Sequence, residues 1–433
     1  MARRWSLLTT LRCSRLLPVL FGLTCVCTSR WAFGLPRAGA QPNVWSLQAA
    51  ESTALERSPK IRSMLATRET AYAYRTFATM PRAGNPFVNL RAMIGRPDQS
   101  AATYAASLGI PFDVAGKRQA WRSEASAMID EADARLEATR NEVRADARGA
   151  YVQVALAHEA RTVAEQTAGT ARELLARVQA RLDASAATAL DLALSESQFA
   201  EATANLSRAE RALVMAQNAF RQALGLHYRA SVDVAALPAP TLPAGLTAEA
   251  AVQRARRNRK ESVAWASTEQ RWQSADRRLR AEAVRPATAQ LETEAQANHD
   301  TQYTVGAAVG FELPLIMKNQ AERAVAHGEA HAADVERELS LHAIEREASS
   351  SYLALQAALT ELAAIEERAL PAAERTLVMV NTMLEAGVVD YFRVLSARSS
   401  AFTLRSRRVE ALREAWLCRI ALERAMGEWE GAP

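Results

Sequence analysis

The chain of 433 residues is poor in glycine, proline and aromatic residues, with 17 Gly, 15 Pro and 6% aromatic side chains. Proline breaks or kinks helices, and long stretches without it run from residue 112 to 237 and from 315 to 370. Alanine dominates the apolar residues, and 23% of the chain is charged. This composition favours long helices whose axes lie close together.

Cysteine is also scarce, since three of the four Cys lie in the first 27 residues and the fourth is Cys418. Residues 1–40 are typical of a secretory signal peptide, because arginines precede the apolar stretch Leu16–Val26 and Ala38-Gly39-Ala40 offers a cleavage site. A membrane anchor is the alternative, but 11 apolar residues are too few to span a bilayer. Once this segment is removed no intrachain disulfide can form, and we expect Cys418 to be a small core residue.

The mature chain has no excess of positive charge. Taking the six arginines of residues 1–40 from 53 basic residues leaves 47, against 48 acidic residues. The sequence pI near 9.2 is therefore due to the arginines of the signal segment, and it does not indicate a nucleic-acid partner.

Motifs of catalysis are missing as well: the chain has no H-E-x-x-H, no G-x-S-x-G and no phosphate-binding glycine loop. We therefore expect no enzyme activity and no cofactor. His327, His331 and His342 fall near one face of an expected helix, which makes them a weak candidate for a metal site. The simpler interpretation is a polar helix face that happens to carry histidines.

What the chain does have is an internal duplication. Three landmarks recur 203, 201 and 202 residues apart, namely a proline that closes an alternating segment, a tyrosine and a closing glycine, at Pro111 and Pro314, Tyr151 and Tyr352, and Gly225 and Gly427. We expect a first repeat over residues 41–233 and a second over 234–433. Each repeat is predicted to hold two strands and long coiled-coil helices.

The strands are expected near residues 87–110 in the first repeat and near 287–313 in the second. In the last of them Tyr303, Val305 and Val309 share one face, while the small residues Gly306 and Ala308 share the other. Alternation over eleven residues matches a membrane-spanning strand of about 9–11 residues. A half-buried strand of a soluble sheet would show the same alternation, but the small residues suit a lumen better than a packed core.

The long helices are expected over residues 118–224 and 321–427. Large apolar residues and alanines alternate there at heptad spacing, at Phe199, Leu206, Leu213 and Phe220 and at Ala202, Ala209, Ala216 and Ala223. The first pair should turn at Ala184-Ser185 and the second at Ala386-Gly387, with a kink or break at Pro371. Two helices cannot bury all their apolar stripes and four strands cannot close a barrel, so several identical protomers in a ring are predicted.

These features together resemble the TolC-like outer-membrane efflux proteins over residues 45–430. The motifs are Ser58-Pro59, Leu108–Phe112 followed by Gly116-Lys117-Arg118, and the second copy Gly310–Leu315 followed by Lys318-Asn319-Gln320. The resemblance implies a homotrimer that forms a twelve-stranded barrel in the bacterial outer membrane and continues as an α-helical barrel across the periplasm. The fold class would be mainly α with a membrane β-barrel portion, most like the heavy-metal-efflux branch.

The resemblance also implies a function and partners. The protein would be a passive duct for small toxic solutes or metal cations, working with a periplasmic adaptor (membrane fusion) protein and an inner-membrane pump of the RND type. Outer-membrane lipid would surround it. The competing interpretation is a periplasmic coiled-coil adaptor or tether that forms no channel. It does not explain why the chain has duplicated amphipathic strands.

Family members narrow the inner mouth with acids in a pattern like D-V-L-D-A. The matching stretch here runs from Arg393 to Ala397 with Ser396 at the second acidic position, so both acids are replaced. Asp390 lies three residues before Arg393 and offers an alternative ring. The candidate constriction residues are therefore Asp390, Arg393 and Ser396, and the candidate adaptor-docking turns are Ala184-Ser185 and Ala386-Gly387.

Overall fold

The computed structural model describes residues 44–81, 84–94, 102–297, 301–386, 388–389 and 391–429. Residues 1–42 separate from a compact unit that holds the rest of the chain, and only this second unit is considered below. The expected signal peptide, the strand connections at 96–99 and 298–300, Gly387 and Asp390 all lie outside the described residues.

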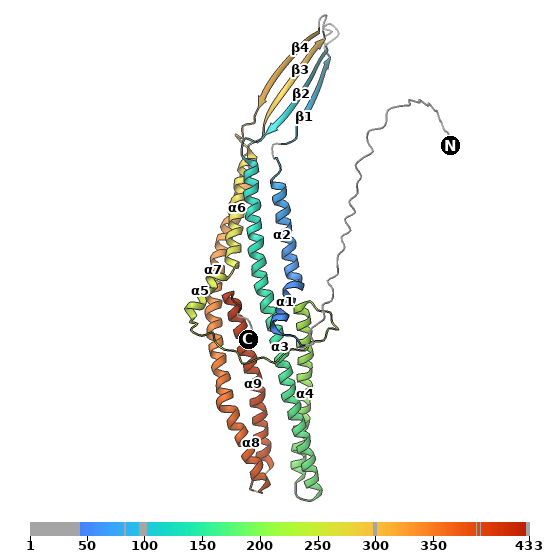
Figure 1. The fold of residues 1–433 in the computed structure, drawn as a ribbon, viewed down its shortest axis with the longest axis vertical. Coiled ribbons are helices and arrows are strands. Elements are labelled where there is room, and N and C mark those ends of the chain that lie inside the picture. Colours follow the sequence, from blue (N-terminus) through green and yellow to red (C-terminus); the bar gives the residue numbers. More distant parts are fainter. Residues whose placement is uncertain are drawn as a thin grey trace, which may run out of the picture. The chain divides into compact units, whose positions relative to one another are not determined.

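The first repeat is built from four helices and two strands (Figure 1). In chain order they are α1 Leu47–Arg57, α2 Pro59–Ala78, β1 Phe87–Ile94, β2 Ala102–Phe112, α3 Lys117–Asp183 and α4 Ala189–Leu224. Helix α3 runs unbroken for 67 residues, which corresponds to about 100 Å at 1.5 Å per residue. It packs against α1, α2, α4, α6 and α9 and is the common support of the unit.

The second repeat follows the same order, with one interruption. Its elements are α5 Ala248–Asn258, α6 Glu261–Ala283, β3 Ala287–Ala297, β4 Thr301–Gly310, α7 Gln320–Ala364, the π-helical segment η1 Ile365–Ala369, α8 Leu370–Glu385 and α9 Tyr391–Met426. The π-helical segment precedes Pro371, which has no backbone N–H to offer the carbonyl four residues earlier. The expected disturbance at Pro371 thus takes the form of one wide turn.

Local sequence explains where the shorter helices begin and end. Ser46 caps α1 by accepting a hydrogen bond from the backbone N–H of Ala49. Ser58 then takes an extended ψ of 126°, because the following Pro59 disfavours the helical conformation, and α1 stops before α2 starts. At the end of the first repeat Gly225 takes a left-handed φ of 64°, and Gly427 does so at the end of the second with 65°.

The strands form one antiparallel sheet in the order β1-β2-β3-β4. The central pair, β2 with β3, joins the two repeats from Ala102 opposite Ala297 to Phe112 opposite Ala287. Strand β4 ends at Gly310, three residues before the predicted end at Leu313, and Pro314, which cannot donate a ladder hydrogen bond, follows shortly after. Strands β1 and β4 are the two edges of the sheet.

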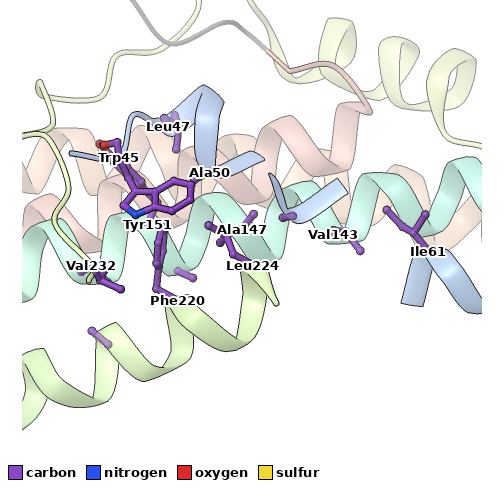
Figure 2. Packing of buried hydrophobic residues seen from close by; sticks show 14 of the residues in the cluster. Trp45, Leu47, Ala50, Ile61, Val143, Ala147, Tyr151, Phe220, Leu224 and Val232 are labelled. Atoms are coloured by element: carbon purple, nitrogen blue, oxygen red, sulfur yellow. The ribbon is translucent and has the colours of Figure 1, made fainter. Parts of the chain in front are cut away.

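An aromatic cluster fixes the start of the first repeat onto its long helices (Figure 2). Trp45, Tyr151 and Phe220 are buried together, and the Trp45 and Phe220 rings meet edge to face with centroids 5.8 Å apart. The Tyr151 hydroxyl lies 3.1 Å from the Trp45 carbonyl oxygen and 3.2 Å from that of Ala235, so it can donate to either. Its counterpart Tyr352 donates to the Leu246 carbonyl at 3.1 Å, just before α5.

A buried ion network joins the repeats. Arg148 on α3 pairs with Glu51 on α1 at 2.9 Å and with Glu423 on α9 at 2.8 Å. Arg419 completes the network by pairing with Glu423 at 3.0 Å. Because Arg148 and Glu423 are both buried, the two charges compensate each other in a region of low dielectric.

The heptad residues of α4 form the seam against α3, as the spacing predicts. Phe220, Ala202 and Ala216 are buried, and the other five heptad residues are half-buried. The narrow alanine positions let the two helices approach closely, which accounts for the extensive α3–α4 contact. Cys418, expected in the core, is half-buried instead and packs at the edge of two apolar clusters on α9.

Candidate functional site

The sheet has two chemically different faces. Residues that pair across neighbouring strands lie on the same face of the sheet. The pairing therefore assigns each row of paired residues, from β1 to β4, to one face. One set of rows is apolar and exposed, and it carries Val88, Leu90, Tyr104, Leu108, Ile110, Leu291, Tyr303, Val305 and Val309. In an isolated chain this is a broad apolar surface in contact with water, which soluble proteins avoid.

The opposite face is mainly polar or carries small side chains, and Phe87 and Met93 of β1 are its large apolar residues. Its rows contain Asn89, Arg91, Ser107, Gln290, Glu292, Glu294, Gln296, Gln302 and Thr304, with Gly306 and Ala308 between them. The row of Arg91 passes through Ala105 to Glu294, so opposite charges face each other across a small residue. One apolar and one polar face on strands of 8–11 residues is the pattern of a membrane sheet around an aqueous lumen.

The α3–α4 turn contains the first predicted docking residues. Ala184 ends α3, and Ser185 takes a left-handed φ of 59° that reverses the chain. Thr188 caps α4 in a reciprocal arrangement, since its backbone N–H donates to Asp191 at 2.9 Å and its hydroxyl oxygen accepts from the Asp191 N–H at 3.2 Å. These bonds lower the pKa of Asp191, with the Thr188 backbone N–H contributing most.

The α8–α9 turn contains the second pair. Ala386 ends α8, its N–H donating to the Thr382 carbonyl, and the N–H of Val388 donates to the Met383 carbonyl at 2.9 Å. Its predicted partner Gly387 lies outside the described residues. The two turns are therefore both helix reversals, but only the first has a capping box among the described residues.

The structure places Arg393 and Ser396 in the first two turns of α9, and both are exposed. Ser396 is three positions after Arg393, so the two residues lie on the same side of the helix. Val394 and Leu395 between them are buried and hold α9 in place. Asp390, the third predicted constriction residue, lies outside the described residues.

One polar contact near these turns was missed by sequence reasoning. Ser195 of α4 is buried, and its Oγ shares a 2.9 Å hydrogen bond with the hydroxyl of Tyr391, the first residue of α9. Burial raises the pKa of Tyr391, so the neutral hydroxyl is favoured. Neither residue belongs to a repeated motif, and only the tertiary structure brings the first turns of α4 and α9 together.

The three histidines do not converge. His327 lies 3.4 Å from Asp276, while His342 lies 4.0 Å from Glu345 on its own helix, and both side chains are exposed. Among the residues that the structure describes, no group of three or more His, Cys, Asp or Glu could hold a metal ion.

Within the described part of the chain, no helix is long and apolar enough to cross a membrane.

Solved structures of other proteins share this architecture. The structure of CusC, which forms a transmembrane channel, matches with a TM-score of 0.70 and 15% identity, covering 88% of this chain and 92% of CusC. The outer membrane protein VceC of Vibrio cholerae matches with a TM-score of 0.71 and 17% identity, covering 88% of this chain and 96% of VceC. The chain therefore shares its fold with CusC and VceC.

Sequence comparison identifies the family. The family model of the outer membrane efflux protein matches residues 51–226 and 247–428, which correspond to the two repeats. The chain belongs to the outer membrane efflux protein family, whose members are channels and not enzymes. The cobalt-zinc-cadmium resistance protein CzcC of Cupriavidus metallidurans is 25% identical over 359 residues, covering 79% of this chain and 81% of CzcC.

Proposed function

We propose that three copies of this chain form a passive duct through the outer membrane and periplasm of a bacterium. The observation that carries the proposal is the sheet, whose apolar face suits lipid and whose polar face suits water. Strands β1 and β4 have unpaired edges, and a membrane sheet with open edges is unstable because lipid cannot satisfy backbone N–H and C=O groups. Joining β4 of one copy to β1 of the next removes these edges.

The helices support the same assembly. Helix α4 exposes Leu190 and Met215, and α8 exposes Val378 and Met379, each to between 54% and 73% of its full surface. Helices α4 and α8 each pack on one neighbouring long helix, α3 and α9 respectively. Pairing α4 of one copy with α8 of the next covers these apolar residues and continues the ring of helices.

Export of small toxic solutes or metal cations follows from the likeness to CzcC, whose name refers to cobalt, zinc and cadmium resistance. The polar face of the sheet carries two acids, Glu292 and Glu294, against one base, Arg91. An aqueous lumen with this lining suits hydrated ions. The energy would come from an inner-membrane pump of the RND type, joined through a periplasmic adaptor that docks on the turns at Ala184-Ser185 and Ala386-Gly387.

The inner mouth of the duct would be narrowed by Asp390, Arg393 and Ser396. A ring of three Arg393 side chains would weaken the cation preference that acidic residues give at this position. Bilayer conductance of the trimer tests this, comparing the wild type with Arg393→Ala. Unchanged conductance and ion selectivity would exclude a role of Arg393 in the constriction.

Membrane fractionation followed by planar-bilayer recording of the detergent-purified protein tests the duct itself. A trimer from the outer membrane that opens discrete pores is expected. A soluble periplasmic protein without conductance would overturn the proposal and favour the tether.

A further inference from the structure

Most of the buried or half-buried arginines have carboxylate partners. Arg148 lies between Glu51 and Glu423, Arg259 between Glu261 and Glu347, and Arg278 between Glu124 and Glu282. Burial alone would lower the pKa of Arg259 and Arg278, but these carboxylates raise both values. The fold therefore usually supplies an acid for each guanidinium it removes from water.

Arg398 on α9 is an exception. Its side chain is half-buried, and it forms no ion pair or hydrogen bond with any residue that the structure describes. Burial lowers its pKa, and repulsion from Arg177 on α3 adds to the effect. Tyr391 and Glu173 oppose the shift without reversing it. The chain thus holds a cation in a partly desolvated place without an ion pair or hydrogen bond among the described residues, which costs stability.

A cavity of about 190 Å³ lies beside this guanidinium, between the α3–α4 pair and the α8–α9 pair. Its polar lining is Thr170, Gln198, Asn205, Arg398 and Ser399, and its apolar lining includes Leu174, Leu377 and Phe402. Two further charged residues line it: Arg405 is paired with Glu374 at 3.0 Å, and Glu201 lies on the exposed side of α4. The cavity thus combines one cation without an ion-pair partner among the described residues, Arg398, with polar and apolar walls, and its other charged lining residues are Glu201 and the paired Arg405.

We propose that this cavity binds a small organic carboxylate, with the carboxylate on Arg398 and the apolar body against Leu174, Leu377 and Phe402. Guanidinium and carboxylate match in charge and in planar, two-pronged geometry. The volume suffices for a single ring, since cavities of about 150 Å³ hold a benzene molecule. Because all four helices line the cavity, the ligand bridges the two helix pairs and stabilises them against separation.

Benzoate is the probe, titrated by isothermal calorimetry into the full-length protein in detergent. Benzamide has the same ring without the charge and separates the guanidinium contact from simple apolar binding. The test variant is Arg398→Gln. The matched control is Arg172→Gln, which removes an exposed arginine of α3 that stacks on Phe199 at 5.7 Å and does not line the cavity.

Saturable benzoate binding is expected in the wild type and in Arg172→Gln, with affinity at least about 10-fold lower in Arg398→Gln, as for a lost charge-assisted hydrogen bond. Benzamide should bind as weakly as benzoate binds to Arg398→Gln. Absence of saturable benzoate binding, or equal binding by Arg398→Gln, overturns the proposal.

Thermal unfolding gives a second, independent readout. Without ligand, Arg398→Gln should unfold at the wild-type temperature or above it, because it removes a half-buried charge that has no ion-pair partner among the described residues. Benzoate should raise the unfolding temperature of the wild type and of Arg172→Gln, but not that of Arg398→Gln. A variant that is less stable than the wild type without ligand, or stabilised equally by benzoate, contradicts the assignment. Neither readout depends on channel activity, so the duct and the carboxylate site are tested separately.

Discussion

The two repeats contain the same long path from the sheet to the helix turn, but they build it differently. In the first, α3 covers 67 residues without a break, whereas α7, η1 and α8 divide their path into 45, 5 and 16 residues. The total lengths agree closely, so the duplication preserves the distance between sheet and turn. The difference shows that one proline changes local helix geometry without altering the reach of the repeat.

The duplicated tyrosines show a second difference. Tyr151 and Tyr352 each donate to a carbonyl 106 residues earlier, at the start of their repeat. Tyr151 also packs within a buried aromatic cluster, while Tyr352 is only half-buried. The hydrogen bond is therefore the shared feature of the repeats, and the aromatic packing is a property of the first repeat.

Replacing Tyr151 and Tyr352 by alanine should give the largest loss of stability and the clearest contrast between the repeats. Tyr151→Ala is expected to lose about 3–5 kcal/mol of unfolding free energy, as for a fully buried aromatic residue. Tyr352→Ala should lose clearly less, because its ring is partly in water already. Denaturant unfolding in detergent measures both. Tyr151→Phe and Tyr352→Phe, which remove only the hydroxyl, should each cost about 1 kcal/mol, and equal losses for the two Ala variants would contradict the contrast.

Introducing a proline into α3 and removing Pro371 from α8 tests why one long path is continuous and the other is interrupted. By the offset of 201 residues between the tyrosines, Pro371 corresponds to Thr170 in the C-terminal part of α3. Thr170→Pro should cost about 3 kcal/mol, because it removes a helical hydrogen bond and clashes with the preceding turn. Pro371→Ala should be near neutral and should slow hydrogen exchange around η1. A tolerated Thr170→Pro would show that both paths accept a break.

Removing the hydrogen bond between Ser195 of α4 and Tyr391 of α9 is expected to have a smaller effect. Tyr391→Phe removes the hydroxyl that meets Ser195, worth about 1 kcal/mol, or roughly a fivefold change in the ratio of open to closed channels. Single-channel recording measures this ratio. Tyr228→Phe, which alters an exposed tyrosine outside the helices, is the control and should leave it unchanged. An unaltered ratio in Tyr391→Phe would mean that the contact does not limit opening.

The capping box at the first helix turn should show the smallest effect. Asp191→Asn is expected to cost no more than about 1 kcal/mol, because the group is almost fully in water. The folded pKa of Asp191 lies below its ordinary value of 3.8, so the stabilisation is complete above that pH and is lost as the pH falls through the folded pKa. Hydrogen exchange of the Thr188 and Asp191 amides measures it. The Val388 amide in the other turn should not respond, and a response there would point to a global change.

Much of the fold was predictable because its signals are local and repeated. Heptad spacing in α4, the Ser58-Pro59 break and the alternation of β4 each depend on neighbours along the chain, and the structure contains all three. The end of β4 was predicted three residues too late, since alternation continues in sequence after the ladder hydrogen bonds stop at Gly310. The proposed constriction at Asp390, Arg393 and Ser396 stays a prediction.

The missed features connect residues far apart in the chain. Ser195 and Tyr391 are 196 residues apart, and the cavity at Arg398 takes its lining from four helices. The two arginines Arg278 and Arg398 look alike in sequence, yet one is paired and the other is not. Glu282, four residues after Arg278 on the same helix, is a local partner, but Glu124 comes from α3, and only the packing of the helices brings it there.

The sequence by itself determined the repeat, its helices and strands, and the family, because periodicity and turn residues act over a few neighbouring positions. Only the tertiary structure decided the pairing register across the sheet, the ion network that joins the repeats, and the half-buried position of Arg398 without an ion-pair partner among the described residues. These features arise from helices and strands packing side by side. Their energies depend on burial and on partners supplied by distant segments, which composition and spacing do not contain.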